Sequence, residues 1–189
     1  MTTAIRLHGA LDDPPEVAAR RAARLGGAGV TLGADEVRGF IQEQLAAVDL
    51  DGKSLCLVVP DGTRSCPLPL LVGAVHAAVQ GRVSRLTTLI ALGTHQPMSE
   101  QALAAHLGYE AGHLEDTYPV MTVLNHEWWD PETFADLGTI HAARIEELSE
   151  GRLSMDVPVH LNRAVVEHDV ALVVGPVLPH EVVGISGGN

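Results

Sequence analysis

The chain has 189 residues, 46% of them hydrophobic and only 3% aromatic, so it can build one domain, or slightly more, around Ala, Val and Leu. Its formal net charge of −12 argues against binding to a nucleic-acid backbone and favours small-molecule chemistry. The chain has only two cysteines, Cys56 and Cys66, which predicts a reduced protein. It has no signal peptide and no apolar run of membrane-spanning length, so we expect a cytoplasmic protein that binds no membrane. The Ala, Arg and Gly bias is typical of a GC-rich bacterial genome.

Short apolar strands alternate with helices along most of the chain. Residues 1–34 are predicted to form an N-terminal strand or arm, and residues 35–189 a single α/β domain. Helical spacing predicts helices over 35–48 behind Asp35 as N-cap, from about Pro67, and from Ser99 through Leu107. Strands are predicted over 55–59, 86–92, 120–124, 157–161 and 170–174. The alternation predicts a doubly wound, Rossmann-like fold, in which helices flank a mostly parallel sheet.

Polar side chains follow four of the predicted strands at the points where those strands end. They are Asp61, Thr63 and Arg64 after the first strand, Thr94 and His95 after the second, Asn125 and His126 after the third, and His180 with the Ser186 loop after the last. One such loop is more often a solvated turn than a site. Because ligands bind outside the carboxyl ends of strands in open α/β sheets, we expect the four clusters to converge on one cleft.

Among the ten histidines, His95 and His180 are the strongest candidates for chemistry, because each lies just past a strand end with glycine nearby. A metal site within this chain is not predicted, because no third ligand has suitable spacing. A role of these histidines as the base that activates a serine nucleophile is disfavoured, because no Gly-x-Ser-x-Gly elbow is present. The third interpretation is an acid/base pair, one on each face of a substrate, as an enzyme that inverts a stereocentre requires. Arg64 would then hold a carboxylate by bidentate contacts.

Most of the other histidines have no strand-end position and are predicted to be surface or structural residues. His126 is intermediate, because the neighbouring Trp128 and Trp129 can bury it. The two tryptophans themselves have two interpretations, as a lining of the substrate pocket or as a packing pair.

Several motifs together resemble the N-terminal domain of the nickel-dependent lactate racemase family. They are Pro60-Asp61-Gly62-Thr63-Arg64, Ala91-Leu92-Gly93-Thr94-His95-Gln96-Pro97-Met98, Asn125-His126, Asn162-Arg163 and Pro179-His180-Glu181-Val182-Val183-Gly184-Ile185-Ser186-Gly187-Gly188-Asn189. The resemblance covers about Leu55 to Asn189, with the motifs in order. It departs at Gly62, where other members can carry His.

The resemblance implies a racemase or epimerase of 2-hydroxy acids such as lactate, acting through a nickel pincer nucleotide. That cofactor is a pyridinium-derived nucleotide tethered to a lysine through a thioamide. One His removes the hydroxyl proton while the Cα hydride moves to the cofactor, and the planar 2-keto acid takes the hydride back on either face. The resemblance assigns catalysis to His95 and His180, substrate binding to Arg64 and Asp61, and cofactor binding to Asp61, Thr63, Ser186, Gly187 and Gly188.

In the family the tethering lysine follows a Ser-Gly-Gly-x sequence, so it is expected just after Asn189. The nickel-binding His and a C-terminal domain are expected further on, which makes this chain the front part of a larger enzyme. The alternative is a shortened homologue that binds a nucleotide or small molecule without turnover. An ordinary hydrolase or NAD enzyme is disfavoured, because the serine elbow and a Gly-x-Gly-x-x-Gly loop are absent.

Overall fold

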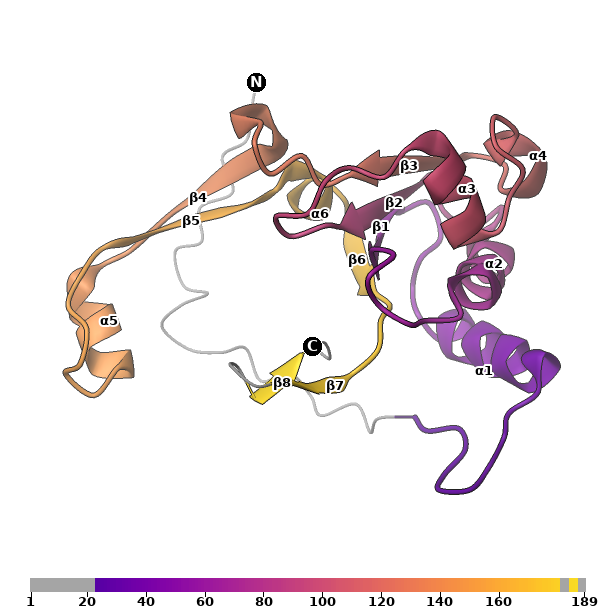
Figure 1. Cartoon of the computed structure of the whole chain (residues 1–189), viewed down its shortest axis with the longest axis horizontal. Helices are drawn as coiled ribbons and strands as arrows, with labels where there is room; N and C mark the ends of the chain where they lie inside the picture. Colours follow the sequence, from indigo (N-terminus) through magenta and orange to yellow (C-terminus); the bar gives the residue numbers. More distant parts are fainter. Residues whose placement is uncertain (1–22, 181–183, 187–189) are drawn as a thin grey trace.

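The computed structural model describes residues 23–180 and 184–186, so the strand expected near the N-terminus lies outside the described residues (Figure 1). The elements are α1 (Ala34–Ala46), β1 (Ser54–Pro60), α2 (Leu68–Val79), β2 (Arg85–Ala91), α3 (Glu100–Leu107), α4 (Leu114–Thr117), β3 (Met121–Asn125), the 3₁₀ turn η1 (Pro131–Thr133), β4 (Phe134–Ile140), α5 (Ala142–Leu148), β5 (Val157–Asn162), α6 (Arg163–Val166), β6 (Val170–Val173), β7 (Leu178–His180) and β8 (Gly184–Ser186). No helix within these ranges is both long and apolar enough to cross a bilayer.

Four strands form one parallel sheet in the order β3-β2-β1-β6, which confirms the predicted α/β fold. The chain proceeds from β1 to β2 and β3 on one side, and later places β6 on the other side of β1. The strand order therefore reverses between β1 and β6. In open α/β sheets such a reversal leaves a crevice outside the carboxyl ends of the two strands, where ligands bind.

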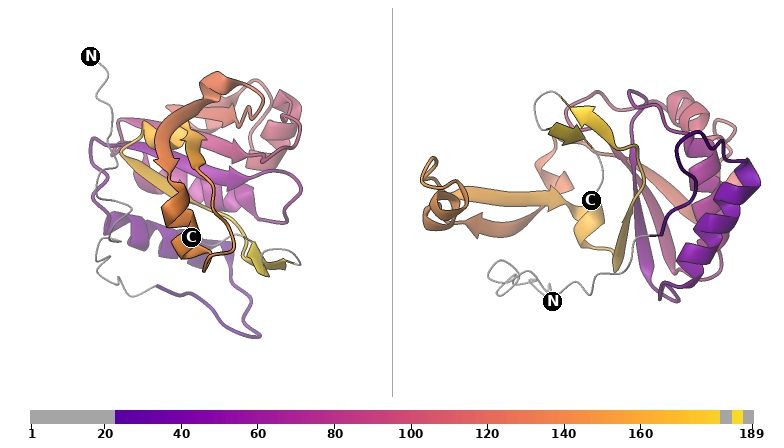
Figure 2. Two further views of the ribbon diagram at one scale, coloured as in Figure 1. Left: turned by 90° about the vertical axis from the view of Figure 1, so that its left-hand side faces the viewer. Right: turned by 90° about the horizontal axis from the view of Figure 1, so that it is seen from below.

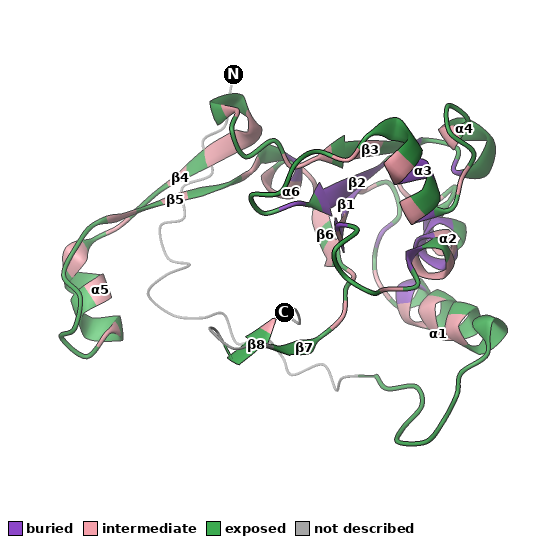
Figure 3. Ribbon diagram, viewed as in Figure 1, coloured by how far each residue is buried: buried purple, intermediate pink, exposed green. Residues whose placement is uncertain are grey.

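One face of the sheet carries the main core. Leu55, Leu57 and Val59 alternate along β1 and are at most 1% exposed, packed with residues of α1, α2 and α3. Burying each leucine contributes roughly 1.5–3 kcal/mol to folding. Figure 3 shows the buried residues gathered between these helices and the strands. The central strands thus hold the loops that follow them on a rigid base.

The opposite face is covered much less completely. Cys56 and Leu89 pack there against Ala164 of the short helix α6. Towards the edges of the same face, Leu124 and Val173 are 46% and 50% exposed. Helices therefore flank both faces, as predicted, but unequally within the described residues. Cys56 and Cys66 are both free thiols.

The helix starts follow local capping chemistry. Ser99 caps α3 as predicted, with its Oγ accepting a hydrogen bond from the Ala102 N–H at 3.3 Å. The prediction that Asp35 caps the first helix was wrong, because α1 begins at Ala34 and its N-cap is Gly33. The Glu36 carboxylate accepts the Gly33 N–H at 2.7 Å. Asp35 instead lies in the first turn, where a negative charge is favourable.

A long hairpin projects from the sheet (Figures 1 and 2). β4 and β5 pair in antiparallel fashion, and α5 lies at the far end. The strand predicted over 157–161 is therefore present, but it belongs to this hairpin and not to the parallel sheet. β4 was not predicted. A second small hairpin, β7 with β8, follows β6, where the sequence predicted His180 and the Ser186 loop.

Candidate active site

A cleft of about 400 Å³ lies where the strand order reverses, within the usual size range of small-molecule sites. Residues that follow β1, β2 and β6 line it, together with Ser186 of β8. Its apolar part comes from the ends of β1 and β6, and its polar part from Asp61, Thr63, Arg64, Thr94 and His95. Three of the four predicted strand-end clusters therefore contribute to one cleft.

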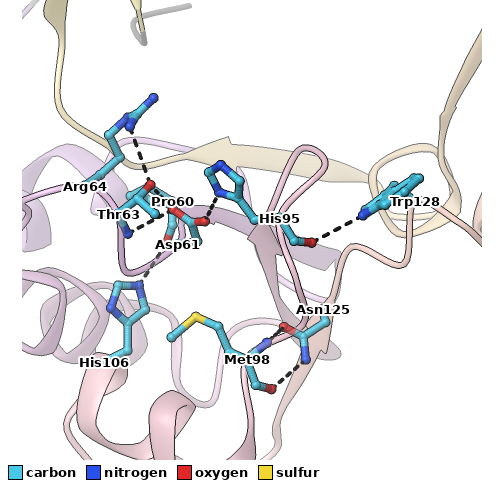
Figure 4. Close-up of polar contacts among 9 residues, drawn as sticks. All are labelled: Pro60, Asp61, Thr63, Arg64, His95, Met98, His106, Asn125 and Trp128. Carbon is cyan, nitrogen blue, oxygen red and sulfur yellow. Dashed lines mark hydrogen bonds and ion pairs between the residues drawn. The ribbon is translucent and has the colours of Figure 1, made fainter.

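Asp61 directly follows β1 and is only 6% exposed. Its Oδ1 accepts hydrogen bonds from the Thr63 N–H at 3.1 Å and from the Thr63 hydroxyl at 2.6 Å (Figure 4). Burial raises the pKa of the Asp61 carboxyl, but the bonds from Thr63 and His95 outweigh it, so the pKa lies below its ordinary value. Asp61 is therefore a carboxylate near neutral pH, and its side chain accepts hydrogen bonds without donating any.

His95 lies in the loop after β2, with its Nδ1 at 2.5 Å from Oδ2 of Asp61. Because the carboxylate only accepts hydrogen bonds, Nδ1 carries the proton, and Nε2 of a neutral imidazole is left as an acceptor. The His95 side chain is 54% exposed, whereas that of Asp61 is 8% exposed. The pair therefore combines a buried carboxylate with an accessible imidazole nitrogen, the arrangement that orients a general base.

Arg64 and Ser186 complete the polar lining of the cleft. Arg64 is exposed, and within the described residues it forms no ion pair with any carboxylate. Its Nη1 approaches the Thr63 hydroxyl at 3.4 Å, and its side chain extends away from Asp61 (Figure 4). An arginine without an acidic partner, in a protein of net charge −12, is available to an anionic ligand.

The predicted residues of the C-terminal segment are only partly described. His180 is the last residue of β7 and is paired with Gly184 across the hairpin, and its side chain lies outside the described part of the chain. Gly187 and Gly188 also lie outside the described residues. Ser186 is the member of this predicted set that lines the cleft.

The prediction that Asn125 and His126 belong to the same cleft was wrong. Neither lines it. The Asn125 side chain binds the backbone of Met98, while Nδ1 of His126 lies 3.0 Å from Nδ2 of Asn162, at the base of the β4–β5 hairpin. The physical reason is the strand order, because β3 lies two strands away from β1 and further from the reversal. Burial lowers the pKa of His126.

Sequence reasoning missed one histidine that contacts the turn at the site. His106 of α3 lies with Nε2 at 2.8 Å from the carbonyl oxygen of Pro60, the residue before Asp61 (Figure 4). Because a carbonyl oxygen only accepts, His106 donates this hydrogen bond. A single histidine on a helix gives no signal of such a contact, which depends on how α3 packs over β1.

Neither tryptophan lines this cleft. Their rings pack edge to face, with centroids 5.8 Å apart and planes at 84°. Both remain substantially exposed, at 40% for Trp128 and 47% for Trp129. They form a packing pair at the surface.

A family model described as the lactate racemase N-terminal domain matches residues 39–189, which is more than half of the chain. The chain belongs to the lactate racemase family. The strand-end residues described above all lie within the matched range. No curated protein matches the chain.

A solved structure is also similar to this chain. A crystal structure of a Thermotoga maritima protein, from the Northeast Structural Genomics Consortium, superimposes with a TM-score of 0.72 and is 26% identical. The match covers 87% of this chain and 38% of that protein, so this chain spans well under half of its length. Within residues 23–180 and 184–186, no group of three or more His, Cys, Asp or Glu side chains is arranged to hold a metal ion.

Proposed function

We propose that the chain is the N-terminal part of a nickel-dependent racemase or epimerase of 2-hydroxy acids, with His95 as one of two acid/base groups. The observation that carries the proposal is the contact of Asp61 with His95 at the mouth of a cleft that also contains Arg64. Racemisation of a 2-hydroxy acid by hydride transfer needs a base for the hydroxyl proton, and a cation can hold the carboxylate. Membership of the lactate racemase family supports this choice of chemistry.

In this proposal His95 accepts the substrate hydroxyl proton at Nε2 and returns it in the reverse direction. Asp61 keeps the imidazole in the tautomer with Nδ1 protonated, and its negative charge stabilises the imidazolium formed after the transfer. Asp61 itself keeps its charge, because its pKa is held below the ordinary value. Asp61 is thus a positioning residue and His95 is the catalytic residue.

Arg64 binds the carboxylate of the substrate. A guanidinium forms two parallel hydrogen bonds to a carboxylate, which fixes the orientation of the acid as well as its position. The exposed Arg64 reaches the cleft from the turn after β1, two residues beyond the small Gly62 and three beyond Asp61. The substrate hydroxyl would then be directed towards Nε2 of His95.

The nickel pincer nucleotide is the cofactor that we propose for this cleft, and when bound it supplies a hydride acceptor and donor. The cleft volume of about 400 Å³ and its position at the strand-order reversal fit a bound nucleotide-like group. Ser186 and Thr63 would contact the cofactor, with Gly187 and Gly188 beside it. The lysine that carries the cofactor is proposed to follow Asn189.

His180 is the proposed second acid/base group, which would serve the opposite face of the substrate. The motif around His180 resembles that of the family and lies within the matched range 39–189, and β7 follows the cleft-lining end of β6 in the chain. Two bases are required because the enantiomers present their hydroxyl protons from different sides of the planar intermediate. With only His95, one enantiomer would react far more slowly than the other.

The test uses the full-length protein loaded with its cofactor, and both enantiomers of a 2-hydroxy acid such as lactate. Wild type should interconvert them, and its intact mass should include a nickel-containing nucleotide adduct on the residue after Asn189. His95→Ala and His180→Ala should each lose interconversion by about 10²–10⁴-fold while retaining the adduct. The control His113→Ala removes an exposed histidine that pairs with Asp116 and does not line the cleft, and it should behave as wild type. A cofactor-loaded His95→Ala enzyme with full activity would exclude the proposed role, and a gene that encodes no lysine after Asn189 would leave only a binding module.

A further inference from the structure

The end of β3 and the segment that follows it contact the loop that carries His95. The Asn125 side chain makes two hydrogen bonds to the backbone of Met98, accepting from its N–H at 3.1 Å and donating to its carbonyl at 3.0 Å. The backbone N–H of His126 donates to the carbonyl of Ile90 at 3.2 Å, near the end of β2. The loop is therefore attached to its neighbour at both of its ends.

A third contact holds the middle of this loop at His95 itself. The indole Nε1–H of Trp128 donates to the backbone carbonyl of His95 at 3.2 Å (Figure 4). The His95 N–H donates to the carbonyl of Leu92 at 3.0 Å. Both backbone polar groups of His95 are thereby engaged. The loop begins at Gly93, whose φ of 60° lies in the left-handed region and whose surroundings are open, so the loop has little packing of its own there.

We propose that Trp128 is a positioning residue, which fixes the backbone of His95 so that the imidazole stays against Asp61. The geometry supports this role because the His95 side chain is 54% exposed and has Asp61 as its hydrogen-bond partner within the described residues. Without the indole contact, rotation of the His95 peptide would move Nδ1 away from a carboxylate that is fixed by Thr63. The inference rests on the proposed catalytic role of His95.

Trp129 provides a matched control in the same segment. It has nearly the same exposure as Trp128 and packs against it edge to face. Within the described ranges, however, its indole N–H has no hydrogen-bond partner. Replacement of either tryptophan by phenylalanine keeps an aromatic ring in the pair, and only W128F removes a bond to the His95 loop.

The experiment compares wild type, W128F and W129F by two readouts. The first is the pKa of the Asp61 carboxyl, followed by carbon NMR on the 189-residue chain as the pH is lowered. W128F should raise this pKa, because the hydrogen bond from His95 is one of the interactions that lower it, and W129F should leave it unchanged. The second is steady-state kinetics of the full-length, cofactor-loaded enzyme, where W128F should lower kcat about five- to tenfold with little change in KM.

The two readouts distinguish a positioning role of Trp128 from a purely stabilising one. An unchanged Asp61 pKa and kcat in W128F, or equal changes in W129F, would overturn the proposal. Wild type offers a check that needs no variant, because the Trp128 indole proton should exchange with solvent more slowly than that of Trp129. If the wild-type enzyme racemises no 2-hydroxy acid, the proposed function fails, whereas the Asp61 titration still decides whether Trp128 positions His95.

Discussion

The loops after β1 and β2 and the segment after β3 look alike in the sequence, but the structure uses them differently. Each follows an apolar strand with polar or aromatic side chains. Asp61 and His95 face a cleft, whereas Asn125 and Trp128 bind the backbone of the neighbouring loop. The difference follows from the position of each strand in the sheet. The strand order reverses between β1 and β6, and β3 is the edge strand on the other side of β2 from that point. Position in the sheet thus decides whether a strand-end residue reaches a ligand or supports a residue that does.

The largest expected effect comes from Asp61→Asn in the full-length enzyme. An amide can donate to Nδ1 of His95 and so favour the wrong tautomer, and racemisation should fall about 10³–10⁴-fold. The matched control is Asp116→Asn, because Asp116 also accepts a hydrogen bond from a histidine Nδ1, that of His113, at 2.9 Å on the surface. Steady-state assays with both enantiomers provide the measurement. Equal activity of the two variants would mean that the Asp61–His95 pair is no more important for catalysis than the Asp116–His113 pair on the surface.

The next effect in size is expected from Arg64→Lys. The substitution keeps the positive charge but loses the planar fork, and kcat/KM for a 2-hydroxy acid should fall roughly 10–100-fold. Arg38→Lys serves as the control, since Arg38 pairs with the exposed Asp35 on α1. An Arg64→Lys enzyme with wild-type kinetics would return Arg64 to the role of a solvated loop residue.

Asn125→Ala tests whether the end of β3 supports the loop that carries His95. It removes both hydrogen bonds to Met98, so the free energy of unfolding should fall by about 1–3 kcal/mol and kcat by roughly tenfold. Urea denaturation and kinetics of the same variant provide the two numbers. Thr139→Ala, at an exposed position of β4 with no side-chain hydrogen bond among the described residues, is the control and should change neither by much. A large rise in KM with unchanged kcat would instead indicate that Asn125 contacts the substrate.

The smallest effect is a pH-dependent change in stability in Thr63→Val. The pKa of Asp61 is lowered in the folded state, so its interactions stabilise the fold above the unfolded pKa of about 3.9 and are lost as the pH falls through the folded pKa. Loss of the Thr63 hydroxyl should raise the Asp61 pKa and destabilise the chain by about 1 kcal/mol near neutral pH. Denaturation at about pH 7 and about pH 2 should show that the difference in unfolding free energy between Thr63→Val and wild type is smaller in acid. A constant difference would mean that the hydroxyl does not act through Asp61.

Much of the sheet and the centre of the site could be predicted from the sequence. Four of the five predicted apolar strands lie in the parallel sheet, and the rule that ligands bind at carboxyl ends points to Asp61 and His95. The order of the strands could not be predicted in the same way, because it depends on pairing between segments far apart in the chain. That is why Asn125 was assigned to the cleft although it lies against Met98.

The β4–β5 hairpin was missed for a local reason. Gly138 has a φ of 102°, and the pairing register shifts between Asp136 and Thr139, so β4 lacks a steady two-residue alternation. The role of Trp128 was invisible for a different reason. An indole that donates to a backbone carbonyl has no spacing signal, and its partner lies 33 positions earlier in the chain.

The most direct test of the central claim is the tautomer of His95 in the wild-type chain. Long-range proton–nitrogen NMR of the imidazole rings, with the His95 signals assigned by their loss in His95→Asn, distinguishes a protonated from an unprotonated ring nitrogen. The contact with Asp61 predicts that neutral His95 carries its proton on Nδ1 and leaves Nε2 free towards the cleft. A neutral His95 protonated on Nε2 would contradict the account, because Asp61 would then not orient it and the nitrogen proposed to accept the substrate proton would already be occupied.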